Sequence, residues 1–140
     1  MNYFNGFLLV LFACALFFAC STTASESGGI FEFEAVGFNE VKSATSDKSA
    51  AVIDARPSVF YELGHIDGAL SLPVIEFDDI FEKFNKEAGL EKFGKIIVYC
   101  SDSGCEDSLL LAKKLREKGV KNIFIYKGGW ADWRKSAAKG

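Results

Sequence analysis

The chain has 140 residues, a formal net charge of −3 and 49% hydrophobic side chains, which suits one folded domain with a leader. A slightly acidic chain without a cluster of lysine and arginine lacks the electrostatic surface that binds a phosphate backbone, so we expect no nucleic-acid partner. Its single histidine and four cysteines do not form the two close ligand pairs typical of a zinc site, so we predict neither a metal nor a cofactor.

The first 20 residues have the pattern of a targeting segment. No charged residue precedes Glu26, and residues 7–20 are apolar throughout, FLLVLFACALFFAC. This run is shorter than the ~20 residues of a membrane span and is typical of the apolar region of a signal peptide. We therefore predict that residues 1–20 are a leader and that the folded domain is exported.

Cys20 indicates how the leader ends. It follows Ala19 and precedes a polar stretch, which resembles the lipobox of bacterial lipoproteins, where the cysteine is lipidated. The resemblance implies a lipoprotein held at the membrane of the cell envelope through Cys20, facing the periplasm or the cell exterior. Cys14 is a second candidate for lipidation. Ordinary cleavage near Ala24 and an uncleaved anchor are the alternatives, and each of them also exports the domain.

The rest of the chain divides into a tether and one α/β domain. Residues 21–29, STTASESGG, are small and polar and predict a flexible tether, so the domain is expected at residues 30–140. Within it, short β-branched runs alternate with amphipathic stretches, which favours a mostly parallel sheet with helices on both faces. We expect strands at 30–35 (an edge strand), 51–54, 70–72, 95–99 and 122–126, helices at 38–44, 58–63, 77–84, 106–115 and from Trp130, and a loop at 46–49.

One turn of this domain carries the chemistry. A buried strand ends at Tyr99, Cys100 follows it, and a helix begins a few residues later. Backbone amides of such a turn and of the first helical residues have no intrahelical partner, so they bind anions and favour a thiolate over a thiol. Cys100 is therefore the predicted catalytic residue, and the predicted substrate-binding loop consists of Ser101, Asp102, Ser103, Gly104, Cys105 and Glu106.

Four motifs in order resemble the rhodanese family, over about residues 35–137. They are Asp54-Ala55-Arg56, the stretch YELGHIDGA at residues 61–69, Tyr99-Cys100, and Gly128-Gly129-Trp130 with Trp133. The resemblance implies a central five-stranded, mostly parallel sheet with helices on both faces. It also implies a sulfurtransferase in which Cys100 carries sulfane sulfur as a persulfide, cradled by the loop amides. Its partners would be a small sulfur donor and a thiol acceptor, either a small molecule or a protein.

The loop departs from the common family pattern in its charge. It is longer, has no lysine or arginine, and carries Asp102 with Glu106 and Asp107 behind it. Carboxylates there should repel thiosulfate unless they point outward as ordinary helix N-terminal residues. Lys127 is either a compensating positive charge or a solvated loop residue. Relatives with longer loops act as phosphatases or arsenate reductases and resemble a Cys-x5-Arg arrangement. Here the fifth residue after Cys100 is Cys105 and no arginine follows until Arg116, which argues against phosphoryl transfer.

Cys105 leaves two interpretations open. It could resolve an oxidised or persulfidated Cys100 in a thiol–disulfide relay, or it could be an inward-packed cysteine at a helix start. The alternative to a sulfurtransferase is a non-catalytic rhodanese module that binds a partner protein at the cell envelope.

Four further residues have structural interpretations. We expect Asp54 and Arg56 to pair with each other or with nearby backbone, and His65 to be a hydrogen-bonded turn residue rather than a general base. Trp130 and Trp133 are expected to close the core, with the neighbouring glycines allowing backbone to approach the pocket.

Overall fold

The computed structural model describes residues 33–139 as a five-stranded sheet in which every strand pairing is parallel, in the order β1-β5-β4-β2-β3. The predicted α/β class and five-stranded sheet are thus confirmed. The strands are β1 Glu34–Ala35, β2 Ala51–Asp54, β3 Leu70–Ser71, β4 Ile96–Tyr99 and β5 Ile123–Tyr126. The helices are α1 Phe38–Asp47, α2 Ser58–Leu63, α3 Phe77–Ala88, α4 Asp107–Glu117 and α5 Gly129–Ala137, with 3-10 turns η1 Val74–Glu76 and η2 Leu90–Lys92.

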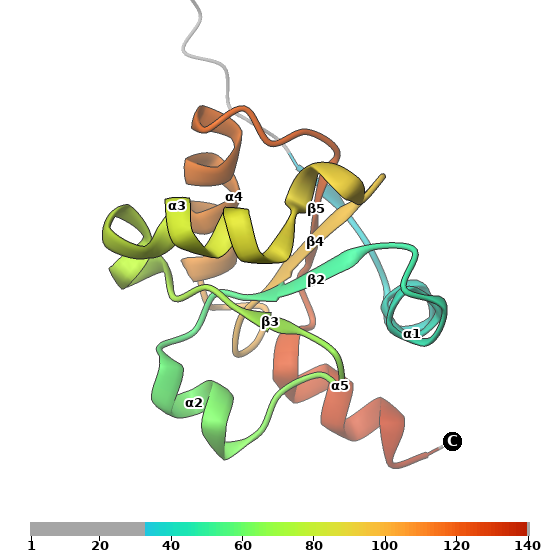
Figure 1. The fold of residues 1–140 in the computed structure, drawn as a ribbon. Helices are drawn as coiled ribbons and strands as arrows, with labels where there is room; N and C mark the ends of the chain where they lie inside the picture. The colour runs from blue at the N-terminus through green and yellow to red at the C-terminus, as the bar shows by residue number, and fades with distance from the viewer. Residues whose placement is uncertain (1–32, 140) are drawn as a thin grey trace, which may run out of the picture.

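Helices cover both faces of the sheet, as the sequence predicts. Helices α3 and α4 lie on one face, and α1 and α5 lie on the other (Figure 1). Strand β4 shows why: Val98 and Cys100 belong to the core under α3 and α4, whereas Ile97 and Tyr99 belong to the core under α1 and α5. Since successive side chains of a strand point to opposite faces, a strand buried on both faces is mostly apolar, and a buried polar side chain in it, such as Asp54 in β2, needs hydrogen-bond partners.

Several element boundaries differ from the prediction; helix α3, for example, continues to Ala88 instead of ending at residue 84. Helix α1 continues to Asp47, so the prediction of a loop from Ser46 was wrong for these two residues. The Ser46 hydroxyl donates to the carbonyl of Lys42 at 2.8 Å, which satisfies a helix carbonyl locally. Lys48 then ends the helix in the left-handed conformation. Strand β1 is an edge strand as expected, but only Glu34–Ala35 of the predicted 30–35 strand is strand among the described residues.

The leader at 1–20, the tether at 21–29 and Cys20 lie outside the described residues. Within residues 33–139, none of the helices has the length and apolar character needed to cross a membrane.

Helix α4 ends in a Schellman motif. The amide of Val120 donates to the carbonyl of Leu115 at 3.0 Å, and the amide of Gly119 donates to that of Arg116 at 2.9 Å. This geometry needs a left-handed residue, and Gly119 has φ of 87°. The glycine therefore ends the helix and turns the chain toward β5.

We predict that Gly119→Ala lowers the free energy of unfolding by about 1–2 kcal/mol, because an L side chain is strained in the left-handed region. No atom lies within 4 Å of the added Cβ, so the loss is conformational. Gly94→Ala is the matched control: its Cβ also meets nothing, and its φ is not positive. Urea unfolding of both variants measures the difference, and equal stabilities would contradict this account.

Candidate functional site

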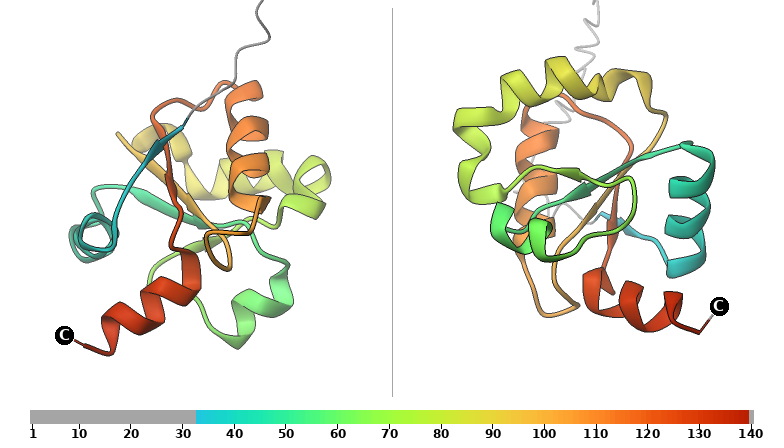
Figure 2. Two further views of the ribbon diagram at one scale, coloured as in Figure 1. Left: turned by 180° about the vertical axis from the view of Figure 1, so that it is seen from behind. Right: turned by 60° about the horizontal axis from the view of Figure 1, so that its bottom comes forward.

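The candidate site lies at the carboxyl edge of the parallel sheet, where ligand sites of such sheets usually form. Strand β4 ends at Tyr99 and delivers Cys100, β2 ends at Asp54, and β5 ends at Tyr126 just before Lys127. The loop that follows β4 lies between α2 and α5 in both views of Figure 2. The topology therefore brings the Cys100 loop, the Asp54–Arg56 segment and the glycine turn before α5 to one place.

Cys100 and Cys105 form a disulfide, with their Cα atoms 6.3 Å apart. The two sulfur-bearing residues differ in accessibility. Cys100 is buried, with 1% of its surface exposed, whereas Cys105 is only partly buried and lines an adjoining cleft. A molecule arriving from solvent therefore meets Cys105 first.

The sulfur of Cys100 lies at the N-terminus of α4. Its Sγ is 3.7 Å from the hydroxyl oxygen of Ser108, in the first turn of that helix, and 3.2 Å from the carbonyl oxygen of Cys105. No side chain caps α4, so amides of its first turn have no capping partner. A helix N-terminus favours an anion, so this position suits a thiolate once the disulfide is reduced.

Ser108 is a site residue that the sequence analysis missed. It is buried, unlike most serines, and its hydroxyl can donate a hydrogen bond to a sulfur anion. The sequence holds a weak signal for it, since position 108 lies only two residues beyond the predicted loop, in the first turn of the predicted helix.

The loop is closed by Asp102. Its carboxylate Oδ1 accepts from the amide of Gly104 at 2.8 Å, and its carbonyl accepts from the amide of Cys105 at 3.2 Å. Asp102 therefore forms an Asx turn, which explains an acidic residue in this place. The Gly104 and Cys105 amides are engaged within the loop rather than directed at a ligand.

Helix α5 fixes the other side of the loop. The amides of Trp130 and Ala131 donate to the carbonyls of Cys100 and Ser101, each at 2.9 Å. Gly129 makes this approach possible: its φ is 59°, and a Cβ there would overlap the carbonyl oxygen of Cys100. The expectation that these glycines let backbone approach the pocket is confirmed for Gly129.

A cleft of about 520 Å³ opens beside the loop. Its charged lining residues are Asp102, Glu106 and Lys127, all exposed. Phe33 and Leu109 add apolar surface. Lys127 is thus close enough to the loop to compensate part of its negative charge, while Asp107 lies at the start of α4 and is half-buried.

Asp54 and Arg56 form a buried ion pair beneath the site, as expected. Asp54 is fully buried, and the guanidinium of Arg56 donates to both of its carboxylate oxygens, with Nη2 2.6 Å from Oδ2. The Tyr99 hydroxyl also donates to Oδ2 at 2.6 Å and accepts from the amide of Ile66 at 3.1 Å. Burial, together with the hydrogen bond to Asp54 and its charge, raises the pKa of Tyr99, so the phenol keeps the proton that it donates.

Arg56 also ties two helices to this pair. It donates to the carbonyl of Gly64 at 2.7 Å, at the end of α2, and its guanidinium lies 5.5 Å from the ring centre of Trp130 in α5. Burial alone would lower the pKa of Arg56, but the hydrogen bond and charge of Asp54 outweigh it and raise that pKa. The guanidinium therefore stays charged.

His65 is a turn residue, as expected. Its Nδ1 lies 2.9 Å from the carbonyl oxygen of Tyr61, and the two rings stack with centroids 3.7 Å apart. The Tyr61 hydroxyl in turn donates to the carbonyl of Ala69 at 2.7 Å. These contacts hold residues 61–69 together, while Trp130 and Trp133 pack against the core on the α1 and α5 face, again as expected.

The sequence profile of the rhodanese-like domain matches residues 38–136. The chain belongs to the rhodanese-like domain family. A candidate mitochondrial thiosulfate sulfurtransferase of Schizosaccharomyces pombe is 32% identical over 120 residues, which cover 81% of this chain and 82% of the yeast protein. The tRNA uridine(34) hydroxylase of Erwinia tasmaniensis is 29% identical over 99 residues, but these are 70% of this chain and only 27% of the hydroxylase.

Solved rhodanese-like structures have the same fold. A Bacillus halodurans protein is 25% identical with a TM-score of 0.64, over 74% of this chain and 73% of its own. The human single-domain sulfurtransferase is 21% identical with a TM-score of 0.60, over 74% of this chain and 97% of its own. The family and its relatives support a general role in sulfur transfer or related chemistry.

We predict that Tyr99→Phe lowers the free energy of unfolding by about 1–3 kcal/mol, because it leaves the buried amide of Ile66 without a partner and removes one of the hydrogen bonds that Asp54 Oδ2 accepts. Tyr126→Phe is the matched control, since Tyr126 is the β5 neighbour of Tyr99 and donates to Asp132 at 2.6 Å. Asp132 is only partly buried and also accepts from Ser136, so this variant should lose less. Denaturant unfolding compares the two, and a larger loss for Tyr126→Phe would refute the argument.

Proposed function

We propose that this domain is a sulfurtransferase that carries sulfane sulfur as a persulfide on Cys100 and discharges it through Cys105. The observation that carries the proposal is the Cys100–Cys105 disulfide at the uncapped N-terminus of α4, in a rhodanese-like fold. A single buried cysteine would support persulfide storage alone. The paired cysteine adds a built-in nucleophile and so supports a relay.

In the first step, the thiolate of Cys100 attacks the terminal sulfur of a donor persulfide, R–S–SH. A new S–S bond forms on Cys100, the donor's S–S bond breaks, and R–S⁻ leaves. The N-terminus of α4 and the hydroxyl of Ser108 favour the attacking anion. The terminal sulfur of the persulfide then extends from the buried Sγ toward the amides of that first turn.

In the second step, the thiolate of Cys105 attacks the Sγ of Cys100. The Cys100–Cys105 bond forms, the persulfide bond breaks, and the sulfane sulfur leaves as HS⁻. Two cysteine sulfurs are thereby oxidised and the sulfane sulfur is reduced. The Cα separation of 6.3 Å lies within the range for a disulfide, so the step needs no large movement of backbone.

A thiol reductant then reopens the disulfide. It attacks Cys105, the more accessible residue, forms a mixed disulfide there, and releases Cys100 as a thiolate. A second thiol attacks the mixed disulfide and frees Cys105. The leaving sulfur is thus the one that the N-terminus of α4 stabilises, and a leaving thiol of low pKa departs faster.

We propose a persulfide or polysulfide as the donor, rather than thiosulfate. Thiosulfate is a dianion, and the cleft presents the carboxylates of Asp102 and Glu106 against the single lysine Lys127. The carboxylate of Asp102 is fixed in its turn, so it does not move away from the mouth of the site.

Intact-mass and peptide measurements on the reduced full chain test the relay. The tryptic peptide 96–113 contains Cys100 and Cys105 but neither Cys14 nor Cys20, so its mass reports on the site alone. With a polysulfide donor, Cys105→Ser should retain one added sulfur atom, Cys100→Ser should retain none, and the wild-type chain should release sulfide and form the disulfide. Thiosulfate should charge Cys105→Ser more slowly by at least about 10-fold.

Two results would overturn the proposal. If neither donor charges Cys100 in folded Cys105→Ser, the domain is not a sulfurtransferase, and the partner-binding module becomes the better account. If wild type and Cys105→Ser retain the sulfur alike, Cys105 does not resolve the persulfide.

We also propose that Cys20 is lipidated and anchors the domain at the cell envelope, in a compartment where disulfides persist. In a bacterial host, labelling with an alkyne fatty acid should mark the wild-type chain and not Cys20→Ser, with Cys14→Ser as the matched control. Labelling that is lost in Cys14→Ser instead would move the anchor to the other cysteine.

A further inference from the structure

Exposed apolar side chains surround the candidate site. In the part of the chain that the structure describes, all exposed large hydrophobic side chains lie on three segments. We call this group of side chains the collar. Each segment follows the carboxyl end of a strand: α2 after β2, η1 after β3, and the first turn of α4 after β4. The collar side chains are Val59, Phe60 and Leu63 on α2, Ile75 on η1, and Leu109 and Leu110 on α4.

The collar is not a by-product of packing. Leu63 is 82% exposed and Ile75 is 73% exposed, and α2 contributes no buried residue to the core. Apolar side chains exposed singly are normal on protein surfaces, whereas a group of them around a reactive centre marks a site of interaction. A small sulfur donor gains nothing from a surface that spans three segments, so the collar fits a macromolecule.

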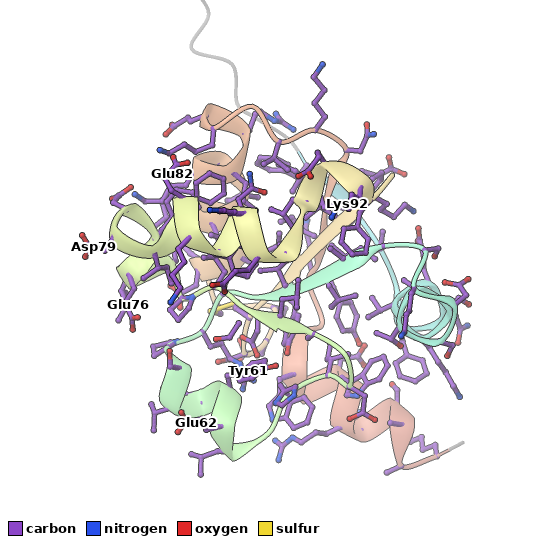
Figure 3. All side chains as sticks on the ribbon, viewed as in Figure 1. Tyr61, Glu62, Glu76, Asp79, Glu82 and Lys92 are labelled. Atoms are coloured by element: carbon purple, nitrogen blue, oxygen red, sulfur yellow. A yellow bond between two sulfur atoms is a disulfide. The ribbon has the colours of Figure 1, made fainter. Side chains whose placement is uncertain are left out.

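Carboxylates accompany the collar. Glu62 lies on α2, Glu76 on η1 and Asp79 on α3, and Figure 3 shows them with Glu82 along one side of the molecule. Glu82 pairs with Lys118 at 2.9 Å, but no ion pair within residues 33–139 engages the other three. Together with Asp102 and Glu106 of the loop, they give this side a negative field that attracts cationic partners.

We propose that the collar docks a protein whose reactive cysteine is flanked by apolar and basic residues, and that this cysteine supplies the thiol that attacks Cys105. The step is R–S⁻ plus the Cys100–Cys105 disulfide giving R–S–S–Cys105 and the Cys100 thiolate. This inference rests on the proposed function, because it names the class of the thiol that reduces the disulfide.

The charges select this occupant among others. A second copy of the chain would bring its own carboxylates against those of Glu62, Glu76 and Asp79, and the repulsion opposes self-association. The uncharged segment 7–20 gains nothing from these carboxylates, and an anionic lipid surface is repelled by them. Only a cationic and apolar partner uses both properties of the surface.

Disulfide opening in the oxidised full chain tests the inference. The probes are two synthetic peptides of equal length with one cysteine, flanked by leucine and lysine in one and by serine and glutamate in the other. Mass spectrometry after alkylation follows the loss of the disulfide in peptide 96–113. We expect the cationic peptide to open it about 10-fold faster than the acidic one, with the advantage shrinking as salt is added.

Surface variants locate the effect. Leu63→Ser and Glu62→Lys should each slow the cationic peptide by about 3- to 10-fold. Glu91→Lys is the matched charge control, since Glu91 lies on η2, which precedes β4 at the opposite end of the sheet. Dithiothreitol, which is small and uncharged, should open all variants at the wild-type rate, which also verifies that they are folded.

Equal rates for the two peptides, or equal slowing by Glu62→Lys and Glu91→Lys, would overturn the docking surface. Charging of Cys105→Ser by polysulfide is measured separately. A failure there with the peptide preference intact would refute the sulfurtransferase and leave the docking surface standing.

Discussion

The buried ion pair of Asp54 and Arg56 organises the carboxyl edge of the sheet. One carboxylate receives the guanidinium of Arg56 and the phenol of Tyr99, so the ends of β2 and β4 are held together. Arg56 extends the cluster to α2 through Gly64 and to α5 through Trp130. Burying such a pair costs desolvation energy, which the many hydrogen bonds offset, and removing one partner would cost about 3–5 kcal/mol. The pair thus determines where the residues beside Cys100 lie rather than the chemistry at its sulfur.

Backbone hydrogen bonds set the shape of the loop that begins at Cys100, above the Asp54–Arg56 pair. Two amides of α5 hold the carbonyls of Cys100 and Ser101, and Asp102 closes the turn from within. The peptide bond is planar and trans, so the carbonyl of one residue and the amide of the next point in opposite directions. A carbonyl held by α5 therefore directs the amide that follows it away from α5. The position of the Cys100 sulfur at α4 therefore follows from α5 and Asp102 acting on opposite sides of the loop.

Much of this arrangement could be predicted from the sequence. The β-branched runs predicted the strands, since a strand buried on both faces is mostly apolar, and the four motifs indicated the family. Two features could not be predicted. Ser46 continues α1, and its hydroxyl donates to the carbonyl of Lys42. This contact could not be predicted, because the composition of residues 46–49 is typical of a loop. Ser108 has no distinctive neighbours in the sequence, and its role depends on the angle at which α4 leaves the loop.

Asp102 shows how a residue's local task can change the chemistry of a site. From the sequence, we predict that its negative charge repels an anionic substrate. In the structure, the same carboxylate closes the turn that brings Cys105 to Cys100. The loop could not carry a basic residue at that position and keep this turn, because lysine and arginine have no acceptor for the Gly104 amide. Position 102 can therefore hold either an acidic residue, which closes the turn and pairs the two cysteines, or a basic residue, which would make the entrance of the site electropositive. This chain has the pairing, and under the proposed function that choice disfavours a small dianion more than a thiol carried by a cationic protein.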